Sequence, residues 1–197
     1  MSIQYLTKKI KGILLKPSET WQEIKEEETT ISNLYKSYAM LLAAIPQVAQ
    51  FIANSIIGYP VRGVNFRVRT NIGRTLGFSI AFYILFLVSL YVISLITNAL
   101  APRFNSTKNI TNAFKLIVFS LTPGWIASIL FIFPSLSPLV ILGGIYWIYL
   151  LYLGLPLMME TPKKKSFGYV IIIALVTLLI SFVINAIVSA IFNPWIT

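Results

Sequence analysis

Five long apolar runs dominate the sequence and determine what kind of structure it can form. The hydrocarbon core of a bilayer is about 30 Å thick, and roughly 20 apolar residues of helix cross it. Only 11% of the 197 residues are charged, against about 25% in soluble domains. The sequence therefore predicts an all-α integral membrane protein with five transmembrane helices. The five runs cover about residues 35–57, 75–100, 113–133, 136–158 and 167–192.

The residues before the first run form a more polar segment, so we divide the chain into N-terminal cytosolic or interfacial helices (1–34) and a membrane domain (35–197). Between Ile3 and Leu15, apolar residues recur on one helical face and lysines lie largely on the other. This pattern is typical of an amphipathic helix on a membrane surface, and equally of a helix packed against the protein's own spans. Pro17 should end this helix. Thr20 and Glu23 have the spacing of a capping box, which predicts a second short helix from about Ser18 or Thr20.

The distribution of Lys and Arg predicts the orientation of the spans, because cytoplasmic loops of membrane proteins carry an excess of positive charge. With the N-terminus inside, twelve of the sixteen basic residues fall on the cytoplasmic side and four on the other. We therefore expect a multi-pass protein of the cell membrane with a cytoplasmic N-terminus and a C-terminus on the opposite side. The four exceptions share one loop, and they are Arg62, Arg67, Arg69 and Arg74.

The net charge of +10 indicates contact with anionic lipid headgroups, rather than with nucleic acid, in a chain this apolar. Alternating apolar and polar residues between 61 and 74 suggest a short extended or hairpin segment. That segment is either bound to lipid phosphates or a solvated loop. The candidate headgroup contacts are Lys8, Lys9, Lys11, Arg62, Arg67, Arg69, Lys163, Lys164 and Lys165.

The chain has few groups with which to do covalent or metal chemistry. It contains no histidine and no cysteine, which excludes disulfides, thiol catalysis and Cys/His zinc sites. All six acidic residues lie outside the five runs, so no buried carboxylate is available to carry a proton. No nucleophile and base stand together in the sequence. We therefore predict a protein that is not an enzyme and has no cofactor.

Uncharged polar residues inside the runs form a second set of candidates, which either pack helices together or line a polar cavity. One group recurs at helical spacing in the first span and another, from Thr177 to Ser189, in the fifth. Within the second group Asn185 is expected to face another helix. Pro46, Pro123-Gly124 and Gly143-Gly144 interrupt three spans, which favours kinked packing. The candidate residues are Gln47, Gln50, Asn54, Lys115, Tyr146, Tyr149, Ser181 and Asn185.

Three segments in order resemble the Yip family, the Ypt/Rab-interacting-protein-like membrane proteins with five spans. Pro-Ser-Glu-Thr-Trp-Gln-Glu-Ile at 17–24 is similar to the P-x-x-[TF]-[WF]-x-x-I motif before that family's first span. Ala113-Phe114-Lys115 through Ser120-Leu121-Thr122-Pro123 looks like its third span, and residues 144–155 look like its fourth. The resemblance extends from about Lys16 to Phe192 and implies a cytosolic N-terminus.

The same resemblance implies a role in membrane shaping or trafficking. Eukaryotic members act with Rab GTPases, and many prokaryotic relatives have no assigned function. This chain has a short N-terminal segment without the acidic DLYGP-type motif, so it resembles the prokaryotic type. We expect a protein that acts through membrane lipids, protein partners or a homo-oligomer. The alternative is a small-molecule or ion transporter or channel with a polar site between spans 1, 3 and 5.

Overall fold

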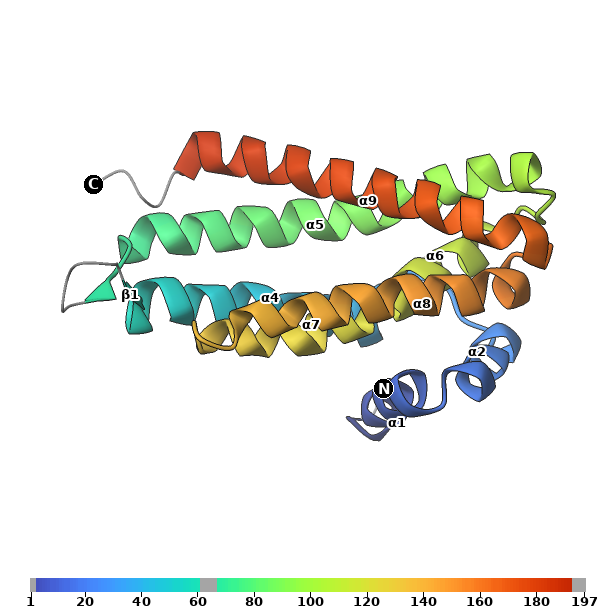
Figure 1. The fold of residues 1–197 in the computed structure, drawn as a ribbon, viewed down its shortest axis with the longest axis horizontal. Coiled ribbons are helices and arrows are strands. Elements are labelled where there is room, and N and C mark those ends of the chain that lie inside the picture. Colours follow the sequence, from blue (N-terminus) through green and yellow to red (C-terminus); the bar gives the residue numbers. More distant parts are fainter. Residues whose placement is uncertain (1–2, 61–66, 193–197) are drawn as a thin grey trace.

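Five helical spans lie side by side in the computed structural model, which describes residues 3–60 and 67–192 (Figure 1). The predicted five-span, all-α membrane fold is confirmed, because five helices are long and apolar enough to cross a bilayer. Each predicted span lies within the matching helix or within one residue of it. The helices run Ile31–Ile57, Ile72–Phe104, Ile110–Ile132, Ser137–Met158 and Lys163–Phe192.

Several spans are built from consecutive helical pieces. The first joins α3 (Ile31–Leu34), a π-helical turn (Tyr35–Ala39), α4 (Met40–Phe51) and a second π-helical turn (Ile52–Ile57). The second is α5 (Ile72–Leu100) with a 3₁₀ turn (Ala101–Phe104). The third joins α6 (Ile110–Ser120), α7 (Thr122–Ala127) and a 3₁₀ turn (Ser128–Ile132). The fourth is a 3₁₀ turn (Ser137–Leu139) and α8 (Val140–Met158), and the fifth is α9 (Lys163–Phe192).

The predicted interruptions have different outcomes. The third span changes helix at Leu121, just before Pro123, because a proline cannot donate the next backbone hydrogen bond. Helix α4 continues through Pro46, and α8 continues through Gly143 and Gly144. A Cβ atom at Gly143 would lie 2.8 Å from the Pro123 carbonyl oxygen. This glycine therefore allows α7 and α8 to pack closely instead of breaking the helix.

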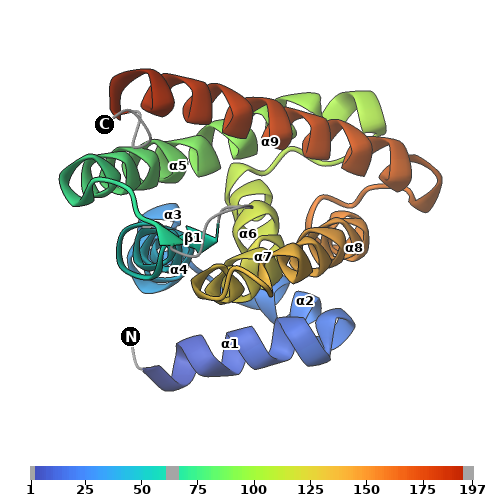
Figure 2. The ribbon, with the colours of Figure 1, turned by 60° about the vertical axis from the view of Figure 1, so that its left-hand side comes forward.

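Two short helices precede the first span and cross its direction (Figures 1 and 2). They are α1 (Ile3–Leu15) and α2 (Pro17–Glu26). The first ends before Pro17, as predicted, but the second begins at Pro17 and not at Ser18 or Thr20. Pro17 occupies the first helical turn, where its missing N–H costs nothing. Thr20 is buried and donates to the Lys16 carbonyl instead of capping the helix (2.9 Å).

We call the end of the bundle near α2 the α2 end, and the opposite end the β-hairpin end. At the latter, β1 (Tyr59–Pro60) pairs antiparallel with β2 (Arg67–Val68). The predicted hairpin in the arginine loop is thus confirmed at its base, whereas Arg62 lies outside the described residues. The last turn of α9 lies at the β-hairpin end, and the first turn lies at the α2 end (Figure 1).

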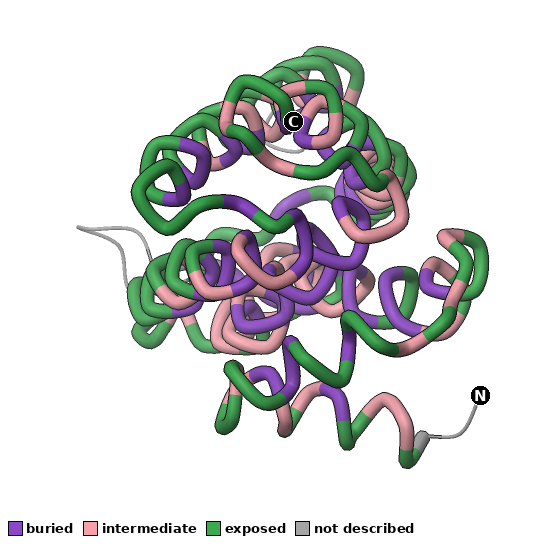
Figure 3. Tube along the Cα trace, turned by 90° about the vertical axis from the view of Figure 1, so that its right-hand side faces the viewer, coloured by how far each residue is buried: buried purple, intermediate pink, exposed green. Residues whose placement is uncertain are grey.

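The third span is the centre of the bundle. Every residue from Ala113 to Ser120 is buried, and buried residues gather in the middle when the molecule is viewed along the spans (Figure 3). Helices α5, α8 and α9 instead present many exposed apolar side chains on their outer faces, such as Val88, Ile145 and Phe182. A soluble protein rarely exposes so much apolar surface. The arrangement is that of helices surrounded by lipid.

Candidate functional site

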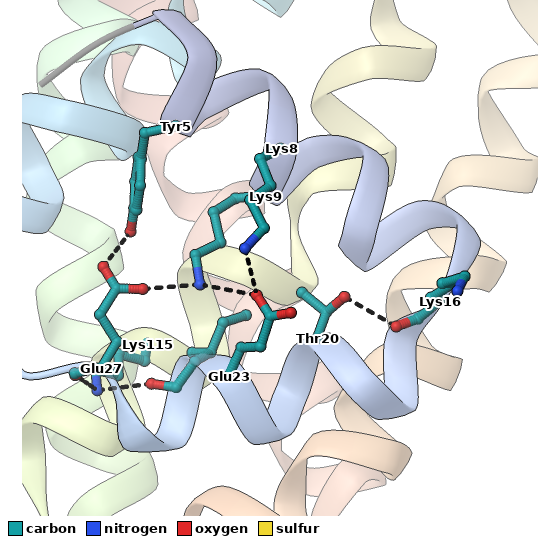
Figure 4. A network of polar contacts seen from close by, with 9 residues as sticks. Tyr5, Lys8, Lys9, Lys16, Thr20, Glu23, Glu27 and Lys115 are labelled. Carbon is teal, nitrogen blue, oxygen red and sulfur yellow. Dashed lines mark hydrogen bonds and ion pairs between the residues drawn. The ribbon is translucent and has the colours of Figure 1, made fainter.

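The Glu27 carboxylate holds α1 against the end of α2 (Figure 4). The Tyr5 hydroxyl donates to its Oε1 atom at 2.6 Å, and the Lys9 ammonium lies 2.8 Å from its Oε2 atom. Lys9 also lies 3.8 Å from Glu23, and Lys8 lies 3.4 Å from the same carboxylate. Ile13 of α1 is fully buried, and Leu6, Ile10 and Leu14 of the same helix pack against the core. The helix is therefore fixed by a buried apolar stripe and a network of charge pairs.

Lys115 connects this pair of helices to the central span. Lys115 is 3% exposed. Its ammonium donates to the Ile24 carbonyl at 2.8 Å and to the Glu27 carbonyl at 2.6 Å. The last carbonyl groups of a helix lack intrahelical partners and attract cations. Lys115, from α6, therefore caps the C-terminal end of α2. From α8, the Tyr146 hydroxyl donates to the Leu14 carbonyl of α1 at 2.9 Å.

These contacts change the acidity of Glu27. Burial alone would raise the pKa of the carboxyl group, but hydrogen bonds from Lys9 and Tyr5 and the charges of Lys9 and Lys115 outweigh it. The pKa of Glu27 is therefore lowered from its ordinary value of 4.5. Burial, followed by the hydrogen bond to Glu27, raises the pKa of Tyr5. Tyr5 thus stays a neutral donor and Glu27 stays a charged acceptor at neutral pH.

The predicted headgroup contacts separate into two groups. Lys9 is the exception among the N-terminal lysines, because its side chain is only 7% exposed. The expectation that Lys9 contacts headgroups is wrong, since the carboxylates of α2 already pair with it. The other described candidates are exposed, namely Lys8 and Lys11 on α1, Lys163, Lys164 and Lys165 in the first turn of α9, and Arg67 and Arg69 at the β-hairpin.

Gln47 and Gln50 line a half-open cavity of about 230 Å³ between α4, α5 and α7. Its walls include Phe86 from the second span and Trp125 from the third. Gln47 also lines a second cavity of about 220 Å³ between α4 and α5, opposite Ser79. The cavities are therefore lined mainly by spans 1, 2 and 3, with Val140 from span 4, whereas the sequence suggested spans 1, 3 and 5.

The other predicted polar residues lie elsewhere. Asn54 is next to the β-hairpin, where its backbone carbonyl accepts from the Thr70 amide at 3.1 Å. Tyr149 is exposed on α8, and its ring packs on that of Tyr146 at 5.5 Å. Ser181 is half-buried on α9. The predicted set therefore does not form one site, because Lys115 and Tyr146 fix the N-terminal helices while Gln47 and Gln50 line the cavity.

The expected orientation of Asn185 is wrong. Asn185 is exposed on α9, and its neighbours Ile184 and Val188 are buried instead. A helix turns about 100° per residue, so eight residues carry Asn185 about 80° round from the buried Thr177. Polar residues at a spacing of four drift off the buried face of a straight helix. The side chain of Asn185 accepts a long hydrogen bond, 3.5 Å, from Ser189 of its own helix.

Sequence reasoning missed two important residues. Glu27 was hidden in a run of three glutamates, where only the middle one lies within reach of Lys9 and Tyr5. Trp125 follows Pro123-Gly124 and lines the cavity. Its span also carries Phe119 and Phe131, so one more aromatic residue did not stand out in the sequence. Phe78, Phe82 and Phe86 also recur at a spacing of four on α5 and stack along it.

The polar groups near these sites are amides, hydroxyls, ammonium groups and separate carboxylates. Across residues 3–60 and 67–192, no three acidic, histidine or cysteine side chains come together as a metal site would need. What the arrangement can do is pair charges, accept and donate hydrogen bonds, and enclose an apolar molecule.

Comparisons with known proteins identify the family. The Yip1 domain matches residues 11–185. The inner membrane protein YohC of Escherichia coli strain K12 is 24% identical over 161 residues, which cover 80% of this chain and 82% of YohC. YohC of Escherichia coli O6:H1 matches to the same extent. No solved structure shows a significant match. Because the Yip1 domain covers most of its length, this multi-pass membrane chain belongs to the Yip1 domain family, as its motifs suggested.

Proposed function

We propose that this protein is a non-enzymatic organiser of the membrane, which uses its N-terminal helices and basic residues to bind anionic lipid headgroups of the cytoplasmic leaflet. The observation that carries the proposal is the attachment of α1 and α2 to the spans by hydrogen bonds from Lys115 and Tyr146. Helices held in this way present their exposed lysines at a fixed position relative to the membrane. Protein partners or further copies of the chain are expected to meet this same surface.

The charge distribution supports lipid binding near the α2 end. Lys163, Lys164 and Lys165 are consecutive and exposed, and only Lys165 has a described side-chain partner, Asn105 at 2.9 Å. Each lysine near an anionic leaflet contributes about 1 kcal/mol of attraction. Three together are enough to favour phosphatidylglycerol over a zwitterionic lipid next to the protein.

Lipid selectivity in reconstituted vesicles tests this proposal. The protein is placed in equal amounts of phosphatidylcholine and phosphatidylglycerol, and the immobilised fraction of spin-labelled lipid of each type is measured. We expect phosphatidylglycerol to be preferred, and the preference to fall severalfold when Lys163, Lys164 and Lys165 are all changed to Gln.

The matched control changes the same three residues to Arg, which keeps the charge and should keep the selectivity. Equal selectivity in the Gln and Arg variants would show that these lysines do not bind the headgroups. A wild-type protein without any preference would contradict the proposal as a whole.

Transport is a second candidate function, favoured by the cavity at Gln47 and Gln50. If it is correct, proteoliposomes containing the protein should leak or take up a solute, and Gln47→Leu should abolish that flux. Survey of potassium, sodium and proton fluxes with entrapped dyes is the first measurement. Fluxes equal to those of protein-free vesicles would remove ion transport from consideration.

A further inference from the structure

Helix α9 lies at the edge of the bundle (Figures 1 and 2) and is the least buried of the five described spans. Between Phe167 and Ile191, all of which the structure describes, Asn185 is the only exposed polar residue of this helix. The exposed side chains of α5 from Leu76 to Ala99, and those of α8, are apolar or tyrosine. One amide therefore stands out on an otherwise apolar outer surface.

The amide of Asn185 lies at the depth of the hydrocarbon. A Cβ atom at Gly77 would lie 2.6 Å from the Phe192 ring, so Phe192 is level with the turn of α5 that follows Arg74. At 1.5 Å of rise per residue, Asn185 is about 15 Å from the level of Arg74 and about 30 Å from Lys165. The hydrocarbon and its two headgroup layers together span about 40–45 Å. When both charged side chains lie in the headgroups, the amide is inside the apolar layer.

This amide lacks the hydrogen bonds that hydrocarbon requires. Among the described residues, its only partner is the Ser189 hydroxyl, which donates to Oδ1 at 3.5 Å, longer than an ordinary O–H···O bond. Its two N–H donors have no acceptor among the same residues. Lipid tails supply neither donors nor acceptors, so unpaired polar groups are costly inside the bilayer. The missing partner therefore belongs to another molecule.

The residues before Asn185 form a seam with it along α9. Ile171, Leu175, Leu178 and Phe182 precede it at alternating spacings of four and three, and each of the four is at least 43% exposed. Side chains at this spacing follow the line along which two helices pack in a left-handed pair. A lipid-facing helix also carries apolar residues there, so the leucines alone do not indicate a partner. Asn185 does, because a polar residue in such a seam pairs with the facing helix.

The chemistry of the amide selects the partner. Asn185 carries both a donor and an acceptor, so two asparagines can bond reciprocally. Copies of one chain insert with the same topology, so their α9 helices run parallel when a two-fold axis along the membrane normal relates them. Such symmetry places the same surface of each copy face to face. The α9 seam (Ile171, Leu175, Leu178, Phe182 and Asn185) is therefore complementary to itself.

We propose that the α9 seam binds the α9 seam of a second copy of this chain, in a parallel dimer in which the Asn185 amide of each copy bonds to that of the other. Within one chain Asn185 has no partner on another helix among the described residues, so the dimer supplies the hydrogen bonds that the fold lacks. The interface lies in the hydrocarbon, whereas the lysines of the headgroup proposal occupy the first turn of α9. Either proposal can therefore fail without the other.

Oxidative cross-linking of the purified protein in phosphatidylcholine vesicles, at a low ratio of protein to lipid, tests the geometry. The chain has no cysteine, so a single substitution reports one position. We expect Leu178→Cys and Phe182→Cys to give disulfide-linked dimers with copper phenanthroline, because seam residues of the two copies come within bridging distance. The matched controls are Val183→Cys and Ile187→Cys, at residues that are exposed on another face of α9. They should give little dimer.

Energy transfer between labelled copies tests the amide. Donor and acceptor dyes are attached at Lys11→Cys on α1, outside the seam, and the protein is diluted stepwise with lipid. Asn185→Leu should weaken dimerisation about threefold to thirtyfold, the range for an interhelical hydrogen bond in a membrane. Asn185→Gln keeps an amide in the seam and should retain most of the association. Unfolding midpoints in detergent, where we expect no change because the residue is exposed, show that each variant is folded.

Four results would overturn the proposal. Energy transfer no greater than that of randomly placed monomers would show that the chain does not self-associate. Equal dimerisation of Asn185→Leu and the unmodified chain would show that the amide does not hold the copies together. Cross-linking of Val183→Cys as strong as that of Phe182→Cys would place the contact on another face. In native membranes, a Phe182→Cys product that contains a different protein would assign the seam to that protein.

Discussion

Lys115 begins inside a span, but its charge lies at the end of another helix. A lysine in hydrocarbon usually extends its side chain to the interface, and here the ammonium meets two carbonyl groups of α2. This geometry satisfies both the buried cation and two of the unpaired carbonyl groups at the helix end. The Lys115 ammonium and the carbonyl groups of α2 thus satisfy each other's hydrogen bonds. The same contact joins the N-terminal helices to the central span.

Replacing this lysine should therefore loosen α2 as well as the bundle. Hydrogen bonds to charged groups contribute about 1.5–3 kcal/mol each, so we expect Lys115→Met to lower the free energy of unfolding by about 2–3 kcal/mol. Lys108→Met, at an exposed residue near the start of α6, is the control and should change it by less than about 0.5 kcal/mol. Chemical unfolding in detergent measures both. Equal stability of the two variants would show that the capping contacts are energetically unimportant.

Acid pH should release α1 through Glu27. Because the folded-state pKa of Glu27 lies below 4.5, its carboxylate stabilises the docked helix above pH 4.5, and this contribution is lost as the pH falls through the folded-state pKa. The chain has no cysteine, so Lys11→Cys provides a single attachment site for a fluorophore. Its emission then reports whether α1 is docked. We expect a change in its emission below pH 4.5.

The same titration distinguishes Glu27 from its neighbours. Glu27→Gln should be partly undocked already at pH 7 and show a smaller change on acidification, whereas Glu26→Gln, at an exposed position, should behave like the unmodified chain. If Glu27→Gln retains the full acid transition, another carboxyl group controls docking.

Residue-level predictions failed where the outcome depended on a partner that is distant in the sequence. Lys9 and Lys8 are adjacent lysines, yet only Lys9 is buried, because the helix turn directs it towards Glu27. Asn185 was assigned to the buried face on a spacing of four, which a straight helix does not maintain. Gln47 remains a candidate that lines two cavities, and the sequence could not say which spans would face it.

At the scale of elements, glycines determine how closely helices approach. A Cβ atom at Gly154 would lie 2.6 Å from Leu116 Cδ1 and 2.9 Å from the Trp21 ring. Trp21 is fully buried, so the ring has little room to move. This glycine lets α2 and α6 pack on the same turn of α8, where the Yip-like motifs of the three segments meet.

Gly154→Ala should therefore destabilise the protein by about 1–3 kcal/mol, the usual cost of overpacking a core. Gly144→Ala is the matched control, since nothing lies within 4 Å of its added methyl group. That change should be neutral or stabilising, because alanine favours the helix by up to about 1 kcal/mol over glycine. Thermal unfolding compares them, and a smaller effect at Gly154 than at Gly144 would disprove the packing argument.

The spans could be predicted from the sequence because the bilayer fixes their length and composition. The placement of α1 could not, since the same apolar stripe suits a lipid surface and a protein surface. In the structure Leu6, Ile10 and Leu14 pack against the core, so the protein surface covers at least part of the stripe. Packing on lipid and packing on protein are distinguished by the hydrogen bonds of Lys115 and Tyr146, and these are with residues far away in the chain.

At the scale of the whole molecule, five spans place the start of the first span and the end of the last span at opposite ends of the bundle (Figure 1). Helix α2 lies at one end, and the last turn of α9 lies at the other (Figure 1). The basic residues of the two ends then decide which faces the cytoplasm. Twelve against four favour the α2 end, but the four arginines lie close together between residues 62 and 74 and oppose the translocation of that segment.

Topology therefore depends on a balance that mutations can shift. Reporter fusions after Lys9 and after Thr197 should lie on opposite sides of the membrane, with the first in the cytoplasm. Changing Lys163, Lys164 and Lys165 to Gln should produce a mixed population, because it reduces the majority from twelve to nine, whereas Arg67→Gln with Arg69→Gln should leave one orientation. Both reporters on one side would contradict five spans. Opposite sides with the first reporter outside would mean that the arginine loop, held together at its base by β1 and β2, outweighs the lysines.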